Sequence, residues 1–453
     1  MQCFKAYDIR GRLGDELTPD IVRTIARAFA EELGAHRVVL GHDPRASSEA
    51  LAASAAEGLR AAGAEVLFLG LCGTEEMYFA TDHLGADAGI EVTASHNPMD
   101  YNGMKLVGPG AKPLPAPVFA AVRARAEAGL FGAAGQGGFA PVDTRAEYVA
   151  RVMSFVDVAA LRPLRVVVNA GNGAAGPTFD ALAAALEAAG APLEFIRLHH
   201  APDGRFPNGI PNPLLPENQP VTAEAVRAHG ADLGVAWDGD FDRCFLFDET
   251  GAFVAGEYVV GLLAEVFLAK EPGAAIVHDP RVIWNTQDVV ARAGGRAVMA
   301  PTGHAYLKAV LRAQGAVYGG EMSAHHYFRD FMCCDSGMIP WLLVAELMGR
   351  TGQSLSQLLA ARRAAFPSSG EVNFKVADVK KIVAKIAYSY GAQAEDVDHL
   401  DGHSFDMGAW RFNLRASNTE PLLRLNVEAR ADLGGDAALV ALKVDELSAF
   451  IAS

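Results

Sequence analysis

The sequence contains few cysteines and no long uninterrupted apolar run. Its five cysteines, at positions 3, 72, 244, 333 and 334, are odd in number and form no C-x-x-C pair, so neither a disulfide framework nor a cysteine-based metal site is expected. The longest apolar stretches, 258–269 and 339–348, each contain a glutamate and are too short to cross a bilayer. Lys5 and Asp8 place charges too early for a signal-peptide core. We therefore expect a cytoplasmic protein.

Basic residues are outnumbered as well. The chain has 39 Lys and Arg against 54 Asp and Glu, a net charge of −15, which argues against nucleic acid or an anionic membrane as a partner. An anionic small molecule would need a local cluster of cations. The sequence has no G-x-x-x-x-G-K-[ST], so a P-loop enzyme has no support, and no G-x-S-x-G, which weakens a hydrolase interpretation.

The chain does contain a pattern of about 100 residues that occurs three times. Continuous apolar runs, expected to be buried strands, alternate with alanine-rich helical stretches, and glycines follow the helices where C-caps belong. This alternation predicts mixed or parallel sheets covered by helices. The expected strands are 37–43, 65–70, 88–94, 164–170, 193–199, 232–237, 274–279, 296–300 and 316–318, and the expected helices are 47–62, 74–84, 177–189, 221–229, 282–293 and 304–313.

The last part of the chain departs from this pattern. Pro367-Ser-Ser-Gly370 predicts a linker. Strands are expected at 372–376, 410–414 and 422–427, and helices at 379–390 and 436–452. The predicted architecture is three similar α/β domains with mixed sheets, at 1–150, 151–253 and 254–367, plus a C-terminal α+β domain at 368–453.

In each α/β repeat the third strand runs directly into a polar cluster. The clusters are Thr93-Ala-Ser-His-Asn-Pro98, Asp238-Gly-Asp-Phe-Asp-Arg243 and Glu321-Met-Ser-Ala-His325. Because ligands of open α/β sheets bind outside the carboxyl ends of the strands, three equivalent strand ends predict one central cleft shared by the domains. In the tail, Arg415-Ala-Ser-Asn-Thr419 suits an anion, since arginine can bind two phosphate oxygens at once; a polar turn is the alternative.

The aspartate triplet has the clearest chemistry. In an extended segment Asp238, Asp240 and Asp242 would place their carboxylates on one side, and without a cation at least one should be protonated. We interpret them as ligands of a hard divalent ion, with Mg²⁺ favoured where a phosphate shares the site. A solvated acidic turn and a calcium loop are the alternatives. The calcium loop requires glycine where Arg243 stands and helices where strands are predicted.

Other polar positions remain ambiguous from pattern alone. Ser95 is either an ordinary turn residue or the carrier of a transferred group. Glu321 suits a sugar hydroxyl or a helix cap, and the Thr-Gly-His segment at 302–304 can be a helix N-terminus. Gly171-Asn-Gly-Ala-Ala-Gly176 matches the dinucleotide fingerprint, but the next strand ends without the acidic residue that would bind the ribose. We interpret these glycines as a tight turn and close helix packing.

Together these segments resemble the phosphohexomutases, the phosphomannomutase and phosphoglucomutase family, over essentially the whole chain. Five signatures occur in the family's order: Tyr7-Asp-Ile-Arg-Gly11, Thr93-Ala-Ser-His-Asn-Pro98, Asp238-Gly-Asp-Phe-Asp-Arg243, Gly320-Glu-Met-Ser-Ala-His325 and Arg415-Ala-Ser-Asn-Thr419. Ala94, Phe241 and Ala324 stand where many members have glycine, and Phe241 must then point away from the ion.

The resemblance implies a phosphoserine enzyme and a role for each matching residue. Ser95 would carry the phosphoryl group and, with Asp238, Asp240 and Asp242, would bind Mg²⁺. The other expected catalytic residues are Lys105, as general acid or base, with His96, Arg10 and Arg243. The expected substrate-binding residues are Tyr7, Asn97, Arg281, Thr302, Gly303, His304, Glu321, Ser323, His325, Arg415, Ser417, Asn418 and Thr419.

The implied reaction is the reversible conversion of mannose 6-phosphate and mannose 1-phosphate through a hexose 1,6-bisphosphate, in a monomer or small homo-oligomer that supplies GDP-mannose synthesis. Glu-Met-Ser at 321–323 favours mannose and glucose phosphates over amino-sugar phosphates. The alternatives are a bispecific phosphoglucomutase/phosphomannomutase and a non-catalytic sugar-phosphate or calcium-binding protein. A dehydrogenase would rest on the glycine motif alone.

Overall fold

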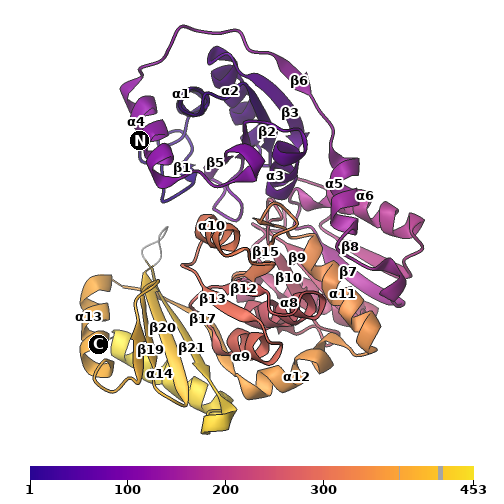
Figure 1. Cartoon of the computed structure of the whole chain (residues 1–453), viewed down its shortest axis with the longest axis vertical. Coiled ribbons are helices and arrows are strands. Elements are labelled where there is room, and N and C mark those ends of the chain that lie inside the picture. Colours follow the sequence, from indigo (N-terminus) through magenta and orange to yellow (C-terminus); the bar gives the residue numbers. More distant parts are fainter. Residues whose placement is uncertain (377, 417–421, 453) are drawn as a thin grey trace. The chain divides into compact units, whose positions relative to one another are not determined.

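A computed structural model describes residues 1–376, 378–416 and 422–452. It divides the chain into two compact units: unit 1 comprises Met1–Phe253 and His325–Gly352, and unit 2 comprises Val254–Ala324 and Gln353–Ser453. Figure 1 follows their elements along the chain. Over the described part of the sequence, no helix combines the length and apolar character needed to cross a membrane.

The first sheet of unit 1 is mixed, with the strand order β1-β5-β4-β2-β3-β6. The strands β2, β3, β4 and β6 run parallel, and β5 runs antiparallel to β4 and β1. The strands are β1 (Ile9–Arg12), β2 (Arg37–His42), β3 (Glu65–Leu71), β4 (Ala88–Val92), β5 (Tyr101–Val107) and β6 (Phe139–Pro141), and the helices are α1 (Pro19–Leu33), α2 (Ser48–Ala61), α3 (Thr74–His83) and α4 (Ala116–Ala128). One core cluster joins α1, α2 and α4 to this sheet.

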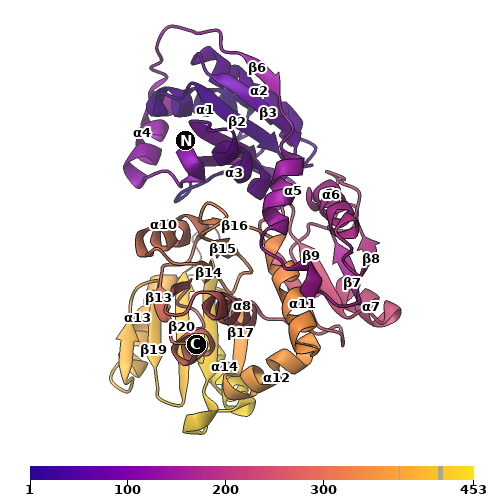
Figure 2. The same cartoon turned by 45° about the vertical axis from the view of Figure 1, so that its right-hand side comes forward.

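The second sheet of unit 1 repeats this plan. The strands β7, β8 and β9 are parallel, and β10 returns antiparallel beside β9. Its elements are β7 (Leu164–Asn169), β8 (Leu193–Leu198), β9 (Leu233–Trp237), β10 (Cys244–Phe247), α6 (Ala175–Ala188) and α7 (Pro220–His229); the short strand β11 (Phe253–Val254) lies where the chain leaves the unit. The helix α5 (Arg145–Met153) connects the two sheets and lies beside α6 (Figure 2). Unit 1 also contains β15 (His326–Phe328), β16 (Cys334–Asp335) and α11 (Ile339–Thr351).

The first part of unit 2 is again α/β. Its strands β13, β12 and β14 are parallel. The elements are α8 (Gly256–Lys270), β12 (Ala275–His278), α9 (Trp284–Arg292), β13 (Arg296–Met299), α10 (His304–Gln314), β14 (Tyr318–Gly320) and α12 (Leu355–Ala365). The expected strand at 316–318 therefore begins two residues later than predicted.

The rest of unit 2 is an antiparallel sheet in the order β17-β21-β20-β19-β18. Its strands are β17 (Ser368–Lys375), β18 (Asp396–Asp398), β19 (His403–Asp406), β20 (Trp410–Ala416) and β21 (Leu422–Ala429). The helices α13 (Val379–Tyr390) and α14 (Ala437–Ala452) pack their apolar residues on it (Figure 1). The predicted combination of mixed α/β sheets with a C-terminal antiparallel domain is confirmed.

The prediction of a linker at 367–370 is wrong for residues 368–370, which form part of a strand. Residues 368–370 belong to β17, whose register is irregular between Ser368 and Glu371. The oxygen Oγ of Ser369 accepts from the Val427 nitrogen at 2.9 Å, and Gly370 takes a φ of +65°. A glycine in the left-handed region is a common device of β-bulges. Serine and glycine therefore form an irregular strand here because β21 supplies partners, which local composition does not reveal.

Candidate active site

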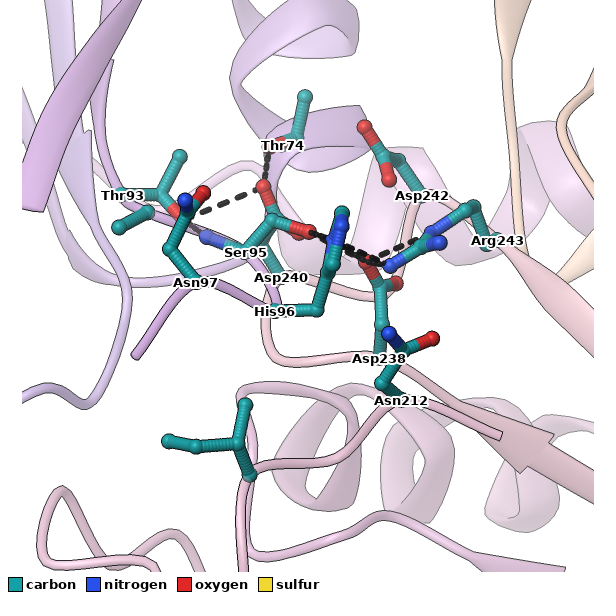
Figure 3. A network of polar contacts seen from close by, with 12 residues as sticks. Thr74, Thr93, Ser95, His96, Asn97, Asn212, Asp238, Asp240, Asp242 and Arg243 are labelled. Atoms are coloured by element: carbon teal, nitrogen blue, oxygen red, sulfur yellow. Dashed lines mark hydrogen bonds and ion pairs between the residues drawn. The ribbon is translucent and has the colours of Figure 1, made fainter. Parts of the chain in front are cut away.

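The loop between β4 and β5 holds Ser95 in a buried and constrained position. Its φ is +47°, in the left-handed region that non-glycine residues rarely adopt. The hydroxyl Oγ donates to Oδ2 of Asp238 at 2.5 Å and lies 3.0 Å from Nδ1 of His96 (Figure 3). A Cβ atom on Gly239 would lie 2.6 Å from the Ser95 carbonyl oxygen, so a glycine is needed for this close approach. A hydroxyl aimed at a carboxylate of a different sheet favours chemistry over an ordinary turn.

The loop between β9 and β10 brings the three aspartates together. One carboxylate oxygen from each of Asp238, Asp240 and Asp242 lies within 4.8 Å of the others, and all three side chains are buried. Within the described part of the chain, their Oδ1 atoms are buried without a hydrogen-bond partner. Buried acceptors that lack donors are costly unless a cation binds them. The three residues therefore fit a hard divalent cation, which prefers oxygen ligands.

The aspartates converge for a different reason from the one predicted. The segment is a turn rather than an extended strand, because the Phe241 nitrogen donates to the Asp238 carbonyl at 3.2 Å and Phe241 has a φ of +45°. The Phe241 ring is fully buried against Gly73, where an added Cβ would lie 2.1 Å from a ring carbon. The flanking elements are the strands β9 and β10, so the helices of a calcium loop are not found at either side of this segment.

Burial and the charges around the triplet shift the pKa values of Asp238 and Asp240 in opposite directions. Burial, reinforced by Asp240 and Asp242 and opposed by Arg243, raises the pKa of Asp238 to about 6. Burial also opposes ionisation of Asp240, but the ammonium of Lys105 outweighs it and holds the pKa of Asp240 below its usual range. Because of these opposite pKa shifts, Asp238 gains a proton before Asp240 does as the pH falls.

Lys105 on β5 is the nearest cation to the triplet. Its Nζ donates to Oδ2 of Asp240 at 2.8 Å and to Oδ2 of Asp242. Thr74, at the start of α3, donates Oγ1 to the same Asp240 oxygen at 2.7 Å. Burial lowers the pKa of Lys105, but the two carboxylates more than offset burial and raise it above its usual value. The lysine therefore stays protonated and occupies the Oδ2 atoms, while the Oδ1 atoms are left for a cation.

Arg243 connects the triplet to the serine loop. Its Nε and Nη2 donate to Oδ2 of Asp238 at 2.9 and 2.7 Å, and Nη2 lies 2.6 Å from Nδ1 of His96. His325 forms a backbone bridge with Arg243. The Nδ1 atom of His325 lies 2.8 Å from Oδ2 of the buried Asp335 and 3.9 Å from Oδ1 of Asp242. A carboxylate on Nδ1 fixes the orientation of an imidazole, so Asp335 orients His325 toward the triplet.

The other residues predicted in unit 1 lie on the same loops or next to them. Arg10 on β1 donates Nη1 to the carbonyl of Thr93 at 2.6 Å, so it holds the start of the serine loop. Asn97 is half-buried on that loop, and Tyr7 is half-buried just before β1. Unit 1 thus brings together Ser95, His96, Asn97, Lys105, Arg10, Arg243, His325 and the three aspartates.

A second set of predicted residues meets within unit 2. Nη2 of Arg281 donates to Oδ2 of Asp279 at 2.7 Å and to Oγ of Ser323 at 3.1 Å, and it lies 3.6 Å from Oε2 of Glu321. The Gly303 nitrogen donates to the same Glu321 oxygen at 3.2 Å. Glu321 therefore accepts at the start of α10, as its helix-capping interpretation predicts. We call Glu321, Arg281 and Ser323, together with Arg415 and Arg424 described next, the polar set of unit 2.

The phosphate loop predicted in the tail is described only in part. Arg415 is buried and pairs with Glu371 at 3.8 Å and with Asp401 at 3.9 Å. Arg424 and Arg281 approach the same Glu371 carboxylate at 3.4 and 3.5 Å. Asp401 also accepts from the Thr302 nitrogen at 3.0 Å, and His304 begins α10. Ser417, Asn418 and Thr419 lie outside the described residues.

Several residues of these networks were not predicted. Asp43 and Arg45 follow β2, and Thr74 follows β3. The rule on strand ends could have identified them, because it applies to every parallel strand and not only to the third one in each repeat. Glu371 carried no local signal, since Arg281, Arg415 and Arg424 lie far away in sequence. Asp335 was not predicted because its contact with His325, ten residues earlier, depends on the pairing of β15 with β16.

The comparisons with known proteins agree with this architecture. Models of the phosphoglucomutase/phosphomannomutase family match four segments: α/β/α domain I at residues 1–133, domain II at 146–251, domain III at 255–366 and the C-terminal domain at 371–442. The chain belongs to the phosphoglucomutase/phosphomannomutase family. It is therefore a phosphohexomutase, an isomerase that acts on hexose phosphates.

Individual relatives agree over nearly the full length. A phosphomannomutase of Salmonella montevideo is 57% identical over 437 residues, which cover 96% of each chain. A phosphomannomutase of Escherichia coli is 55% identical over 456 residues, covering 100% of this chain and 99% of the relative. The crystal structure of a phosphoglucomutase/phosphomannomutase family protein from Burkholderia thailandensis superposes with a TM-score of 0.86 at 34% identity, over 99% of this chain and 97% of the other.

Proposed function

We propose that this protein is a phosphomannomutase that interconverts mannose 6-phosphate and mannose 1-phosphate. Two relatives that match it over almost their whole length carry this name. The observation that carries the proposal is the buried Ser95 hydroxyl on Oδ2 of Asp238, next to a carboxylate triplet whose Oδ1 atoms lack donors. A phosphate carrier beside a cation site is what phosphoryl transfer requires, because this chemistry depends on positioning and charge neutralisation.

Asp238, Asp240 and Asp242 would hold the cation, which we propose to be Mg²⁺, together with an oxygen of the phosphorylated serine. When bound, this ion supplies neutralisation of the charge on the transferring phosphoryl group. The fit rests on three buried carboxylates with unpartnered Oδ1 atoms. Oxygen-only ligands of this kind suit Mg²⁺ better than a softer metal.

The side chains of unit 1 would then perform the transfer. The bond between phosphorus and Oγ of Ser95 breaks, a bond forms to a hydroxyl of the sugar, and that hydroxyl loses its proton. Lys105 and Arg243 would stabilise the charge on the transferring oxygens, as preorganised donors do. Despite burial, two carboxylates raise the pKa of Lys105, so it keeps its proton until negative charge develops on the leaving Oγ, and it can donate the proton there because an alkoxide is a stronger base than an amine. The imidazole of His325, oriented by Asp335, is a candidate to take the hydroxyl proton.

The product of this step would be a hexose 1,6-bisphosphate, which returns its other phosphoryl group to Ser95. The polar set of unit 2 offers ligands for the rest of such a molecule. Glu321 and Ser323 can bind vicinal hydroxyls, because a carboxylate accepts and a hydroxyl both donates and accepts. Arg281, Arg415 and Arg424 offer guanidinium groups for the phosphate that is not reacting. We assign Ser417, Asn418 and Thr419 to the same phosphate on the resemblance alone.

A bispecific enzyme that also acts on glucose phosphates is the second candidate, because the matched family models include phosphoglucomutases. Coupled assays with mannose 1-phosphate and glucose 1-phosphate, each with Mg²⁺ and a trace of the bisphosphate, separate the two. We expect turnover of mannose 1-phosphate. Equal kcat/KM values would establish the bispecific enzyme, and absence of turnover with both sugars would contradict a mutase.

A further inference from the structure

Arg45 is a buried arginine that follows β2 and binds the backbone of the serine loop. Its Nη2 donates to the carbonyl oxygens of Ser95 at 2.9 Å and Asn97 at 2.6 Å. Its Nη1 donates to those of Pro98 at 2.9 Å and Tyr101 at 3.3 Å. One guanidinium therefore bonds four carbonyls of a single loop, while only 3% of the residue is exposed.

The conformation of the serine loop depends on the positively charged guanidinium of Arg45. Four carbonyl dipoles that point toward one place repel each other, and buried carbonyls without a donor are unfavourable. A planar fork of donors, always protonated, satisfies several of them at once. Ser95 takes a φ of +47° within this loop, and such a backbone persists only where its surroundings enforce it. Without the guanidinium, the loop would relax to a conformation in which the serine backbone is no longer constrained.

Asp43 holds the other end of the same loop. It is fully buried, and its Oδ2 accepts from Oγ1 of Thr93 at 2.8 Å and from the Ala94 nitrogen at 3.3 Å. Its Oδ1 accepts from the Arg45 nitrogen at 2.9 Å and from Oγ of Ser48 at 2.5 Å. Two residues that follow β2 thus contact the loop on both sides of the serine: Asp43 binds it before Ser95, and Arg45 binds it after Ser95.

Arg45 also contacts the second sheet's connections within unit 1. Its guanidinium lies 5.5 Å from the centre of the Phe206 ring, and its backbone bridges to Gly204. A Cβ atom on Gly204 would lie 1.9 Å from the Pro44 carbonyl oxygen, so the two backbones are in direct contact. The segment that follows β8 therefore packs against Arg45, the same arginine that binds the serine loop. The hydroxyl of Ser95 on that loop contacts Asp238, which follows β9.

We propose that Arg45 is a positioning residue for phosphoryl transfer: it fixes the backbone of the serine loop so that Oγ of Ser95 stays at the aspartate triplet. The inference rests on the proposed role of Ser95 as phosphate carrier. Within the described residues, none of the hydrogen bonds of Arg45 reaches the triplet, so its loss should slow transfer rather than weaken substrate binding. A small displacement of a reacting group is enough, since misplacement by about 1 Å can cost about 100-fold in rate.

The test compares Arg45→Met and Arg45→Lys with Arg60→Met. Arg60 is a matched control, because it donates Nε to the carbonyl of Gly137 at 2.9 Å in the same α/β region, away from the serine loop. We expect Arg45→Met to lower kcat about 100-fold, while KM for mannose 1-phosphate changes less than about threefold. The rate at which the bisphosphate phosphorylates Ser95 should fall by the same factor as kcat. Mn²⁺ binding should be unchanged. Arg45→Lys should recover only part of the rate, because one ammonium cannot span four carbonyls.

The outcomes separate the inference from the proposed function. If Arg45→Met is folded and phosphorylates Ser95 at the native rate, or if its whole kcat loss equals its unfolded fraction, Arg45 is not a positioning residue. If Arg45→Met does not fold, Arg45→Lys decides: native kcat in this variant overturns the inference, and a lowered kcat at unchanged KM supports it. If the native protein never carries phosphate on Ser95, the proposed function itself fails.

Discussion

The two polar networks of this molecule are built differently. In unit 1, the serine, lysine and arginine bind the aspartates at 2.5–2.9 Å, and these side chains are nearly inaccessible. In unit 2, Arg281, Arg415 and Arg424 surround the single carboxylate of Glu371 at 3.4–3.8 Å. Close contacts fix a geometry, whereas the longer ion pairs to Glu371 leave Arg415 and Arg424 available to another anion; Arg281 is also held by Asp279 at 2.7 Å. The first network suits chemistry at one phosphorus atom, and the second suits capture of a phosphate.

Among changes to the charged residues of the two networks, the largest expected effect comes from removing one carboxylate of the triplet. Asp242→Asn should lower kcat/KM about 1,000-fold, because it removes one charge and one ligand from a site that stabilises the transferring group. Mn²⁺ binding, measured by electron paramagnetic resonance, should weaken at least about tenfold. Removal of the metal with a chelator should abolish turnover, and Mg²⁺ should restore it.

The control for this change is Asp248→Asn. Asp248 is also a buried aspartate of the second sheet, but its Oδ1 accepts from the nitrogens of Thr250 and Ala252 instead of facing the triplet. Its Mn²⁺ binding should equal that of the native protein. Equal loss of Mn²⁺ binding in both variants would mean that the triplet is not the cation site.

Lys105→Met should separate metal binding from catalysis. The change removes the ammonium that occupies the Oδ2 atoms of Asp240 and Asp242, so Mn²⁺ should bind more tightly to the more negative triplet. Activity should nevertheless fall about 100-fold, because a preorganised donor to the transferring group is lost. Weaker Mn²⁺ binding together with unchanged kcat would contradict the role assigned to Lys105.

The smallest expected effect tests the network of unit 2. In Glu371→Gln the three arginines lose the negative charge of their shared carboxylate, so KM for mannose 1-phosphate should fall about threefold, which corresponds to less than about 1 kcal/mol of binding free energy. Slower release should lower kcat by a similar factor. Glu265→Gln, a change on the exposed side of α8, should alter neither constant. A rise in KM would show that Glu371 holds the arginines in place for the substrate.

The sequence indicated most of the fold and the chemically active loops for physical reasons. Continuous apolar runs between alanine-rich helices can only be buried strands, so the parallel strands were located within a few residues. The three polar clusters lie at strand ends as predicted. The strand expected at 372–376 begins earlier, at Ser368, because Ser368 and Gly370 are loop-forming residues that become part of a strand only when β21 provides their partners.

The site was less accessible to sequence reasoning wherever a role depends on distant partners. Arg45 is one polar residue after a strand, and nothing local shows that its guanidinium bonds four carbonyls about fifty residues away. Asp335 lies only ten residues from His325, but its role depends on the pairing of β15 with β16, which brings the two side chains together. The aspartate spacing was informative, although the turn at Phe241, and not an extended strand, brings the carboxylates together.

We propose that Ser95 carries the transferred phosphoryl group, and the proposed mutase activity depends on this role. Intact-protein mass spectrometry of the native protein and of Ser95→Ala, each incubated with the hexose bisphosphate, tests it directly, with Ser154→Ala as an exposed-serine control. We predict that the native protein and Ser154→Ala gain one phosphoryl group and turn over mannose 1-phosphate, while Ser95→Ala gains none and is inactive. A Ser95→Ala protein that still becomes phosphorylated, or that keeps most of its turnover, would contradict the account.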